Sequence, residues 1–343
     1  MNKTLKFFLK LGAIICAVAV LIGIANYKYI NGYYYKDVYG EVQKFNNVPN
    51  HITFANFGTS HGLAAFRYDK NDTSSFNFAL SGEDIYHDFQ TLKQFSGHLD
   101  KGCIVSIPVS YFSFCLPDDE PSQKRYYTYL DKEYLIDFSY ETLINSKYVP
   151  VLRSIEYLFK DIIGDQEINM ENFMDDPAET TKSNTGQISP LLKVSAATID
   201  IPATDNSAKI QALNQHAVTR AESWRSGRMV LGEKYMDDNT KLLIEMIDYC
   251  KKHEFQPVLL TIPVFHSLTE AFTKEELEKY YFSNIKETVK ATGITYIDYS
   301  HDERFVNTPS YYSNSDHMSA EGADSFIKIY KEDLLLKGYS IQQ

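Results

Sequence analysis

Two short segments, near opposite ends of the chain, contain residue types that can carry out acyl transfer. Residues 58–62 read GTSHG and include Ser60, and the second segment contains Asn314, Asp316 and His317. A serine hydroxyl becomes a nucleophile when a histidine removes its proton, and a third group beside the histidine orients the ring. These residue types predict Ser60 as the nucleophile and His317 as the general base.

The elements around these segments must bring them together. An apolar run at 52–57 precedes Ser60, and a helical pattern at 320–337 follows His317. A small-residue turn between a parallel strand and a helix places its serine at the carboxyl edge of a sheet, where the helix amides also point. Each segment alone also fits an ordinary helix cap. The pairing of the two favours catalysis.

Short apolar runs alternate with helical patterns along most of the chain. Strands are expected at 52–57, 75–80, 103–109, 257–262 and 295–298, and helices at 84–95, 237–253, 274–291 and 320–337. This alternation is typical of parallel strands joined by crossover helices. It predicts an α/β, three-layer αβα, flavodoxin-like doubly wound parallel sheet of about five strands.

The segment between the third and fourth expected strands is much longer than a crossover requires. We expect an insertion at about 112–235, with packed helices at 126–163 and a long flexible loop or lid at 165–206, where the composition is polar. The expected organisation is an N-terminal anchor at 1–27, a juxtamembrane segment at 28–50 and an ectodomain at 51–340 that contains the insertion.

The N-terminal segment has the composition of a membrane span. Three lysines lie within residues 1–10, and residues 11–27 contain no charge. Residues 7–27 are long enough to cross a bilayer, and the positive flank predicts a single-pass protein of the cell membrane with a cytoplasmic N-terminus and an extracytoplasmic remainder. A cleaved signal peptide, with Gly23 and Ala25 at the cleavage site, is the alternative. The length of the apolar run favours the anchor.

Composition excludes several classes of protein. The 343 residues carry a formal net charge of −11, which provides no basic surface for nucleic acid. A hydrophobic content of 44% with only 16 Gly and 11 Pro excludes collagen and global disorder. Outside the apolar segment, Cys103, Cys115 and Cys250 are odd in number and lack metal-ligand spacing, so we expect buried thiols with at most one disulfide.

Together the two segments resemble the SGNH/GDSL hydrolase superfamily, specifically its membrane-anchored cell-envelope branch, which includes the teichoic acid D-alanyl transfer protein and polysaccharide O-acetyltransferases. The resemblance covers about residues 52–109 and 257–339. It implies that Ser60 is the nucleophile, that His317 is the base, and that the backbone amides of Ser60 and Gly82 form an oxyanion hole.

Two positions depart from the family pattern. Ser110 follows the third expected strand where the family has an Asn, so either Ser110 is the third donor of the oxyanion hole or the site lacks that contact. The family also has Asp three residues before the His, and here that position is Asn314. Asp316 lies directly before His317 instead. Because a charged partner serves a general base better, Asp316 is favoured as the third catalytic residue and Asn314 is the alternative.

The resemblance implies an extracytoplasmic serine esterase or acyltransferase that acts, without a cofactor, on a cell-envelope polysaccharide or teichoic acid carrying acetyl or similar acyl groups. A membrane acyl-transporting protein is an expected partner. The alternative is a catalytically weak SGNH-like carbohydrate-binding or assembly protein. His61 is expected to shape the nucleophile turn, and His87 and His266 to line the cleft. The latter two lack metal-ligand companions at useful spacing, so no metal is expected.

Overall fold

The computed structural model describes residues 2–69, 71–117, 124–152 and 206–341 of the chain. The chain divides into two compact units. The first unit comprises Met1–Asn47 and Pro121–Asn184, and the second comprises Val48–Glu120 and Thr185–Gln343.

The second unit is built on a sheet of five strands in the order β2-β1-β3-β4-β5. The strands are β1 (Ile52–Asn56), β2 (Ser75–Asn77), β3 (Leu99–Pro108), β4 (Gln256–Thr261) and β5 (Thr295–Asp298). Every neighbouring pair is parallel. The fold class predicted from the sequence is therefore confirmed. In such a sheet, ligands bind beyond the carboxyl ends of the strands where the strand order reverses, which here is between β1 and β3.

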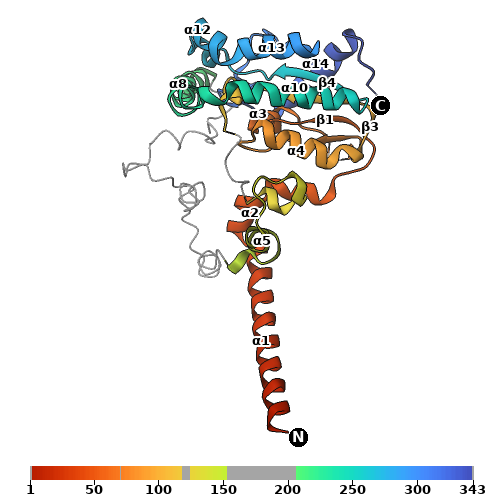
Figure 1. Cartoon of the computed structure of the whole chain (residues 1–343). Helices are drawn as coiled ribbons and strands as arrows, with labels where there is room; N and C mark the ends of the chain where they lie inside the picture. Colours follow the sequence, from red (N-terminus) through yellow and green to blue (C-terminus); the bar gives the residue numbers. More distant parts are fainter. Residues whose placement is uncertain (1, 70, 118–123, 153–205, 342–343) are drawn as a thin grey trace. The chain divides into compact units, whose positions relative to one another are not determined.

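Helices cover both faces of this sheet (Figure 1). On one face lie α3 (Ser60–Ala65) and α14 (Ala320–Leu336), which share a hydrophobic core with β1, β3 and β4. On the other face α10 (Met236–Lys252) packs between α4 (Ile85–Phe95) and α13 (Ser283–Thr292). Apolar spacing explains this placement, because the buried apolar residues of α10 recur every three or four positions along one side: Leu243, Met246, Ile247 and Cys250.

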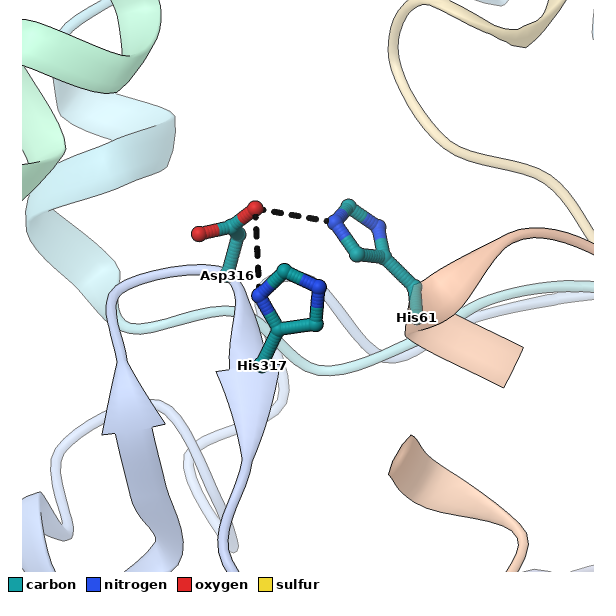
Figure 2. Close-up of side chains that lie close together, drawn as sticks. All are labelled: His61, Asp316 and His317. Atoms are coloured by element: carbon teal, nitrogen blue, oxygen red, sulfur yellow. Dashed lines mark hydrogen bonds and ion pairs between the residues drawn. The ribbon is translucent and has the colours of Figure 1, made fainter. Parts of the chain in front are cut away.

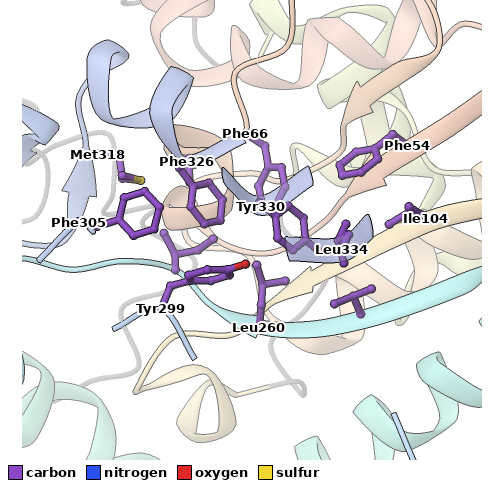
Figure 3. Packing of buried hydrophobic residues seen from close by; sticks show 13 residues of the cluster. Phe54, Phe66, Ile104, Leu260, Tyr299, Phe305, Met318, Phe326, Tyr330 and Leu334 are labelled. Atoms are coloured by element: carbon purple, nitrogen blue, oxygen red, sulfur yellow. The ribbon is translucent and has the colours of Figure 1, made fainter. Parts of the chain in front are cut away.

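An aromatic-rich core joins β1, β3 and β4 to α14 (Figure 3). Phe54 of β1 and Leu260 of β4 pack with Phe326 and Tyr330 of α14. The buried Tyr330 hydroxyl is satisfied by the Ser106 hydroxyl at 2.9 Å. Full burial of each large apolar side chain stabilises the fold by about 1.5–3 kcal/mol. This core therefore fixes the start of α14 relative to the strand ends.

The insertion between β3 and β4 contains regular structure that was not predicted from the sequence. Its later part forms α8 (Asn206–Trp224), a π-helix at Arg225–Met229 and α9 (Val230–Gly232), which lead into α10 through a 3-10 turn at Glu233–Tyr235. The loop or lid predicted at 165–206 lies outside the described residues, apart from Asn206, the first residue of α8.

Three further segments differ in detail from the prediction. The helix expected at 274–291 consists of α12 (Lys274–Leu277), a π-helix at Glu278–Phe282 and α13. Neither the short α11 (His266–Glu270) nor the antiparallel pair β6 (Tyr312–Asn314) and β7 (His317–Met318) was predicted.

The first unit contains the long helix α1 (Lys3–Asn31), followed by α2 (Tyr33–Tyr39). An 18-residue window of α1 has a mean hydropathy of 2.6, so this helix is long and apolar enough to act as a membrane anchor or as a signal sequence. Short helical segments make up the rest of the described unit: Glu41–Asn47, Tyr126–Thr128, Lys132–Tyr134, Tyr140–Leu143, Ile144–Tyr148 and Pro150–Leu152.

The end of α1 is tied to the first part of the insertion. The Asn26 side chain donates to the Tyr148 carbonyl at 3.1 Å and accepts from the Val151 amide at 3.3 Å. Tyr29 and Tyr35 pack with Val151 in a small buried cluster. The first part of the insertion thus helps to build a compact unit. The described helical segments at 126–152 are short, and the rest of the packed helices predicted at 126–163 lies outside the described residues.

The three cysteines beyond α1 are buried free thiols, as predicted. Burial raises the pKa of Cys115 and Cys250 to about 12 and that of Cys103 further. A thiolate is the reactive form of cysteine, so none of the three is poised as a nucleophile.

Candidate active site

The turn after β1 places Ser60 at the carboxyl edge of the sheet. Gly58 has φ = +101°, and a Cβ built on it would lie 2.9 Å from the carbonyl oxygen of Pro108. Thr59 then caps α3 by accepting a hydrogen bond from the His61 amide at 3.3 Å. Glycine is therefore required for a turn that brings Ser60, the first residue of α3, to the point where the strand order reverses.

His317 approaches Ser60 from the β6–β7 hairpin that precedes α14. Its Nε2 lies 2.8 Å from the Ser60 Oγ, and its Nδ1 lies 3.0 Å from the Asn314 Oδ1. Since the amide oxygen can only accept, we assign the ring proton to Nδ1. The lone pair of Nε2 then points at the Ser60 hydroxyl, which is the arrangement that a general base requires.

The Asn314 side chain organises this hairpin. Its Oδ1 accepts from the Asp316 amide at 3.2 Å and the His317 amide at 2.9 Å, in addition to the His317 ring. Three N–H groups thus converge on one buried oxygen, which fixes the orientation of the side-chain amide. Asn314 holds both the backbone and the ring of His317.

Asp316 contacts the rings of both His317 and His61 (Figure 2). Its Oδ2 is 3.4 Å from the Nδ1 of His317 and 3.1 Å from the Nε2 of His61. The Nε of Arg220 is 3.1 Å from the carboxylate. Burial would raise the Asp316 pKa, but hydrogen bonds from the two histidines and the Arg220 charge lower it well below its ordinary value. Asp316 is therefore a buried, charged carboxylate shared among three side chains.

His61 connects this carboxylate to the end of β3. Burial is the main cause that lowers the His61 pKa to about 4, so the ring is neutral at neutral pH. The carboxylate can only accept, so Nε2–H donates to Asp316 and Nδ1 accepts the Ser110 hydroxyl proton at 2.7 Å. His61 thus positions Asp316, and both of its ring nitrogens are already hydrogen-bonded within the protein.

Ser110, the expected third oxyanion donor, already uses both of its hydrogens. Its hydroxyl donates to His61, and its amide donates to the Ser113 Oγ at 2.9 Å. Its Oγ also lies 3.3 Å from the Thr59 Oγ1. A contact between Ser110 and an oxyanion would require one of these bonds to break.

The other predicted site residues occupy separate positions along the sheet edge and helices. Gly82 lies in an exposed turn after β2 with φ = +64°. His87 is buried in the first turn of α4, where its Nδ1 lies 2.7 Å from the Asp84 Oδ2. His266 starts α11 and pairs with Glu270 at 3.2 Å. No metal-ligand constellation forms around either histidine among the described residues.

Two residues of the site were missed in the sequence, and both come from α8. Arg220 binds Asp316, and the Nδ1 of His216 lies 2.8 Å from the Ser315 Oγ. The signal that could have identified this helix is its apolar spacing: Ile210, Leu213, Ala217, Ala221 and Trp224. Two of these five residues are alanines, which makes the pattern weak.

The ligand atoms of His61, Asp316 and His317 all lie within 4.8 Å of one another, a spacing that could suit a metal ion. Each of these atoms already has a protein partner, and the guanidinium of Arg220 lies against the same carboxylate. A divalent cation would be repelled by Arg220 at short range. The residues therefore fit a hydrogen-bonded network better than a metal site.

A small hollow opens beside the site. It is lined by apolar residues and a few polar groups: His61, Val109, Ser110, Tyr111, Trp224, Thr261, Ile262 and Val264.

Comparison with known proteins gives no family assignment. No family model matches the chain, and a search of curated proteins found no match. What the arrangement can do chemically therefore follows from its geometry: a partly exposed serine hydroxyl is hydrogen-bonded to a neutral imidazole nitrogen, and the ring is held by an amide oxygen beside a buried carboxylate.

Proposed function

We propose that this protein is a membrane-anchored, extracytoplasmic serine esterase or acyltransferase of the SGNH type, acting on acyl groups of a cell-envelope polysaccharide or teichoic acid. The observation that carries the proposal is the 2.8 Å contact between the Ser60 Oγ and the His317 Nε2, in a ring whose Nδ1 is held at 3.0 Å by Asn314. The motif resemblance described above supplies the substrate class.

In the proposed mechanism, the Nε2 of His317 takes the Ser60 proton while Oγ attacks the ester carbonyl carbon. The tetrahedral oxyanion is stabilised by the backbone amides of Ser60 and Gly82. Collapse breaks the ester C–O bond, and His317 returns its proton to the departing alcohol. Water or a sugar hydroxyl then attacks the acyl-serine in the same way, with His317 again as base.

The location proposed for this reaction rests on α1. The helix can cross a bilayer, and the lysines that precede its apolar stretch favour a cytoplasmic N-terminus. The second unit then faces the outside, where an acyl-transporting membrane protein is the proposed source of acyl groups.

Labelling with a fluorophosphonate tests the nucleophile. The full-length protein in detergent should be labelled at Ser60, and Ser60→Ala should abolish both labelling and hydrolysis of 4-nitrophenyl acetate while leaving thermal unfolding unchanged. Peptide mapping matters because Ser110 and His61 form a second serine–histidine contact at 2.7 Å. Labelling of Ser110, or full activity of Ser60→Ala, would contradict the proposal.

Two observations favour a second candidate, a catalytically weak carbohydrate-binding or assembly protein. Asn314, which is uncharged, occupies the position nearest to the His317 Nδ1, and both hydrogens of Ser110 are engaged within the protein. A folded protein that resists fluorophosphonate and hydrolyses no ester, yet binds an envelope oligosaccharide, would support this candidate instead.

A further inference from the structure

Arg228 has no ion-pair partner among the described residues. It lies on the π-helix Arg225–Met229, a rare helical form that is frequent at functional sites. Its guanidinium carbon is 4.1 Å from the centre of the Phe112 ring. Within the part of the chain that the structure describes, no carboxylate lies within ion-pair distance of Arg228 and no side chain or carbonyl accepts a hydrogen bond from it.

The Phe112 ring links Arg228 to the candidate active site. Phe112 packs edge-on against His61, with ring centres 5.8 Å apart, and the ring centre of His61 is 5.0 Å from that of His317. Arg228 also lies close enough to the buried Asp316 and Arg220 for both charges to act on it. The Phe112 ring therefore lies between the guanidinium of Arg228 and the His61 ring, and His61 lies next to His317.

Among the described residues, Asp316 carries the one negative charge that acts on Arg228, while Arg220 adds a second positive charge and His61 is neutral. Burial lowers the pKa of Arg228 to about 10, which still leaves it charged at neutral pH. A partly buried cation without a counterion is costly, and an anion that arrived there would remove much of that cost.

Arg225, on the same π-helix, shows the ordinary alternative. Its Nε lies 2.6 Å from the Glu276 carboxylate and its Nη1 lies 2.8 Å from the Glu222 carboxylate. The described part of the chain thus supplies two carboxylates to one arginine of this segment and none to the other. Arg228 instead lies over the Phe112 ring.

We propose that Arg228 binds an anionic group of the substrate, a carboxylate or a phosphate, beside the ester that Ser60 attacks. This inference rests on the proposed function and narrows its substrate to a polyanionic envelope polymer. A guanidinium suits such a group because its parallel N–H donors match two oxygens of a carboxylate or a phosphate.

Binding to the full-length protein in detergent tests the inference without catalysis. The probes are trigalacturonate, which carries carboxylates, a glycerol phosphate oligomer, and neutral maltotriose, titrated at constant ionic strength. At least one anionic probe should bind ten times or more tightly than maltotriose. Arg228→Gln should weaken that binding about tenfold or more. Arg228→Lys should restore it in part, because lysine keeps the charge but lacks the fork.

Arg225→Gln is the matched control, since it removes the same charge from the same π-helix and should leave the affinity for the anionic probe unchanged. Tighter binding of trigalacturonate would indicate a carboxylate as the natural anion, and tighter binding of the glycerol phosphate oligomer would indicate a phosphate. Equal affinity for anionic and neutral probes, or equal weakening by the two variants, would overturn the inference. If Ser60 is labelled but the protein shows no preference for the anionic probes, only the role of Arg228 is refuted. If an anionic probe binds in a way that depends on Arg228 but Ser60 is not labelled, only the enzymatic proposal is refuted.

Discussion

Replacing Asp316 by Asn removes a negative charge beside His317 with almost no change in side-chain size. The Asp316 Oδ2 lies 3.4 Å from the His317 Nδ1. At an effective dielectric constant of about 20, unit charges at this separation attract by about 5 kcal/mol. Arg220, 3.1 Å from the same carboxylate, offsets part of this attraction. We therefore expect the transition state, in which His317 is an imidazolium, to lose about 3–5 kcal/mol of stabilisation.

That loss corresponds to a fall in kcat of about 10² to 10⁴. The assay is hydrolysis of 4-nitrophenyl acetate by the full-length protein in detergent, with thermal unfolding as the check on folding. Asn314→Ala tests the effect of geometry without charge, because it removes the oxygen that lies 3.0 Å from the His317 Nδ1 and changes no charge. Asn314→Ala should also lower the rate, since Nδ1 then loses its nearest acceptor.

A double variant separates charge from geometry. Combining Asn314→Asp with Asp316→Asn moves the carboxylate to the position that now lies nearest to the Nδ1 of His317, and should recover much of the activity that Asp316→Asn loses. A folded Asp316→Asn protein whose kcat stays within about threefold of wild type would refute the electrostatic reasoning. It would then assign the orientation of the ring to Asn314 alone.

Three further predictions address the fold, pH and topology. Gly58→Ala should destabilise the protein by about 1–3 kcal/mol and reduce ester turnover, because its φ of +101° and the nearby Pro108 carbonyl exclude a Cβ; unchanged thermal unfolding would contradict this. The free energy of unfolding should fall by up to about 3 kcal/mol as the pH drops from 6.5 towards 4. His61 is the cause, because its ring binds a proton near pH 6.5 in the unfolded chain, whereas burial lowers its pKa to about 4 in the folded protein. His61→Gln should flatten that slope in thermal unfolding, and an unchanged slope would assign the loss to other groups. A reporter fused after Gln343 should be active only outside the membrane, and cytoplasmic activity would reverse the proposed orientation.

The regular part of the fold was predictable because its signals are local. The runs that became β1 and β5 are short, and the buried residues of α10 repeat at helical spacing. The serine and histidine segments could also be found, since the expected parallel sheet brings the carboxyl ends of its strands to one edge.

The electrostatic environment of the site was not predictable, since it depends on contacts between residues far apart in the sequence. Arg220 is an ordinary charged residue of a helix with many small residues, and nothing nearby in the sequence indicates that its guanidinium is buried against Asp316. The choice between Asn314 and Asp316 depends on the turn between β6 and β7, which places both side chains at the same nitrogen.

The distance along the chain between Ser60 and His317 has a consequence for folding. Contacts between residues so far apart form late, because a long loop must be closed before they are made. During synthesis, Ser60 emerges long before His317, its proposed base, and α8 must also dock before Arg220 can pair with Asp316. In the proposed mechanism, a partly folded chain therefore carries an unactivated serine. Reactivity of Ser60 towards an electrophile would report, molecule by molecule, that the second unit has finished folding.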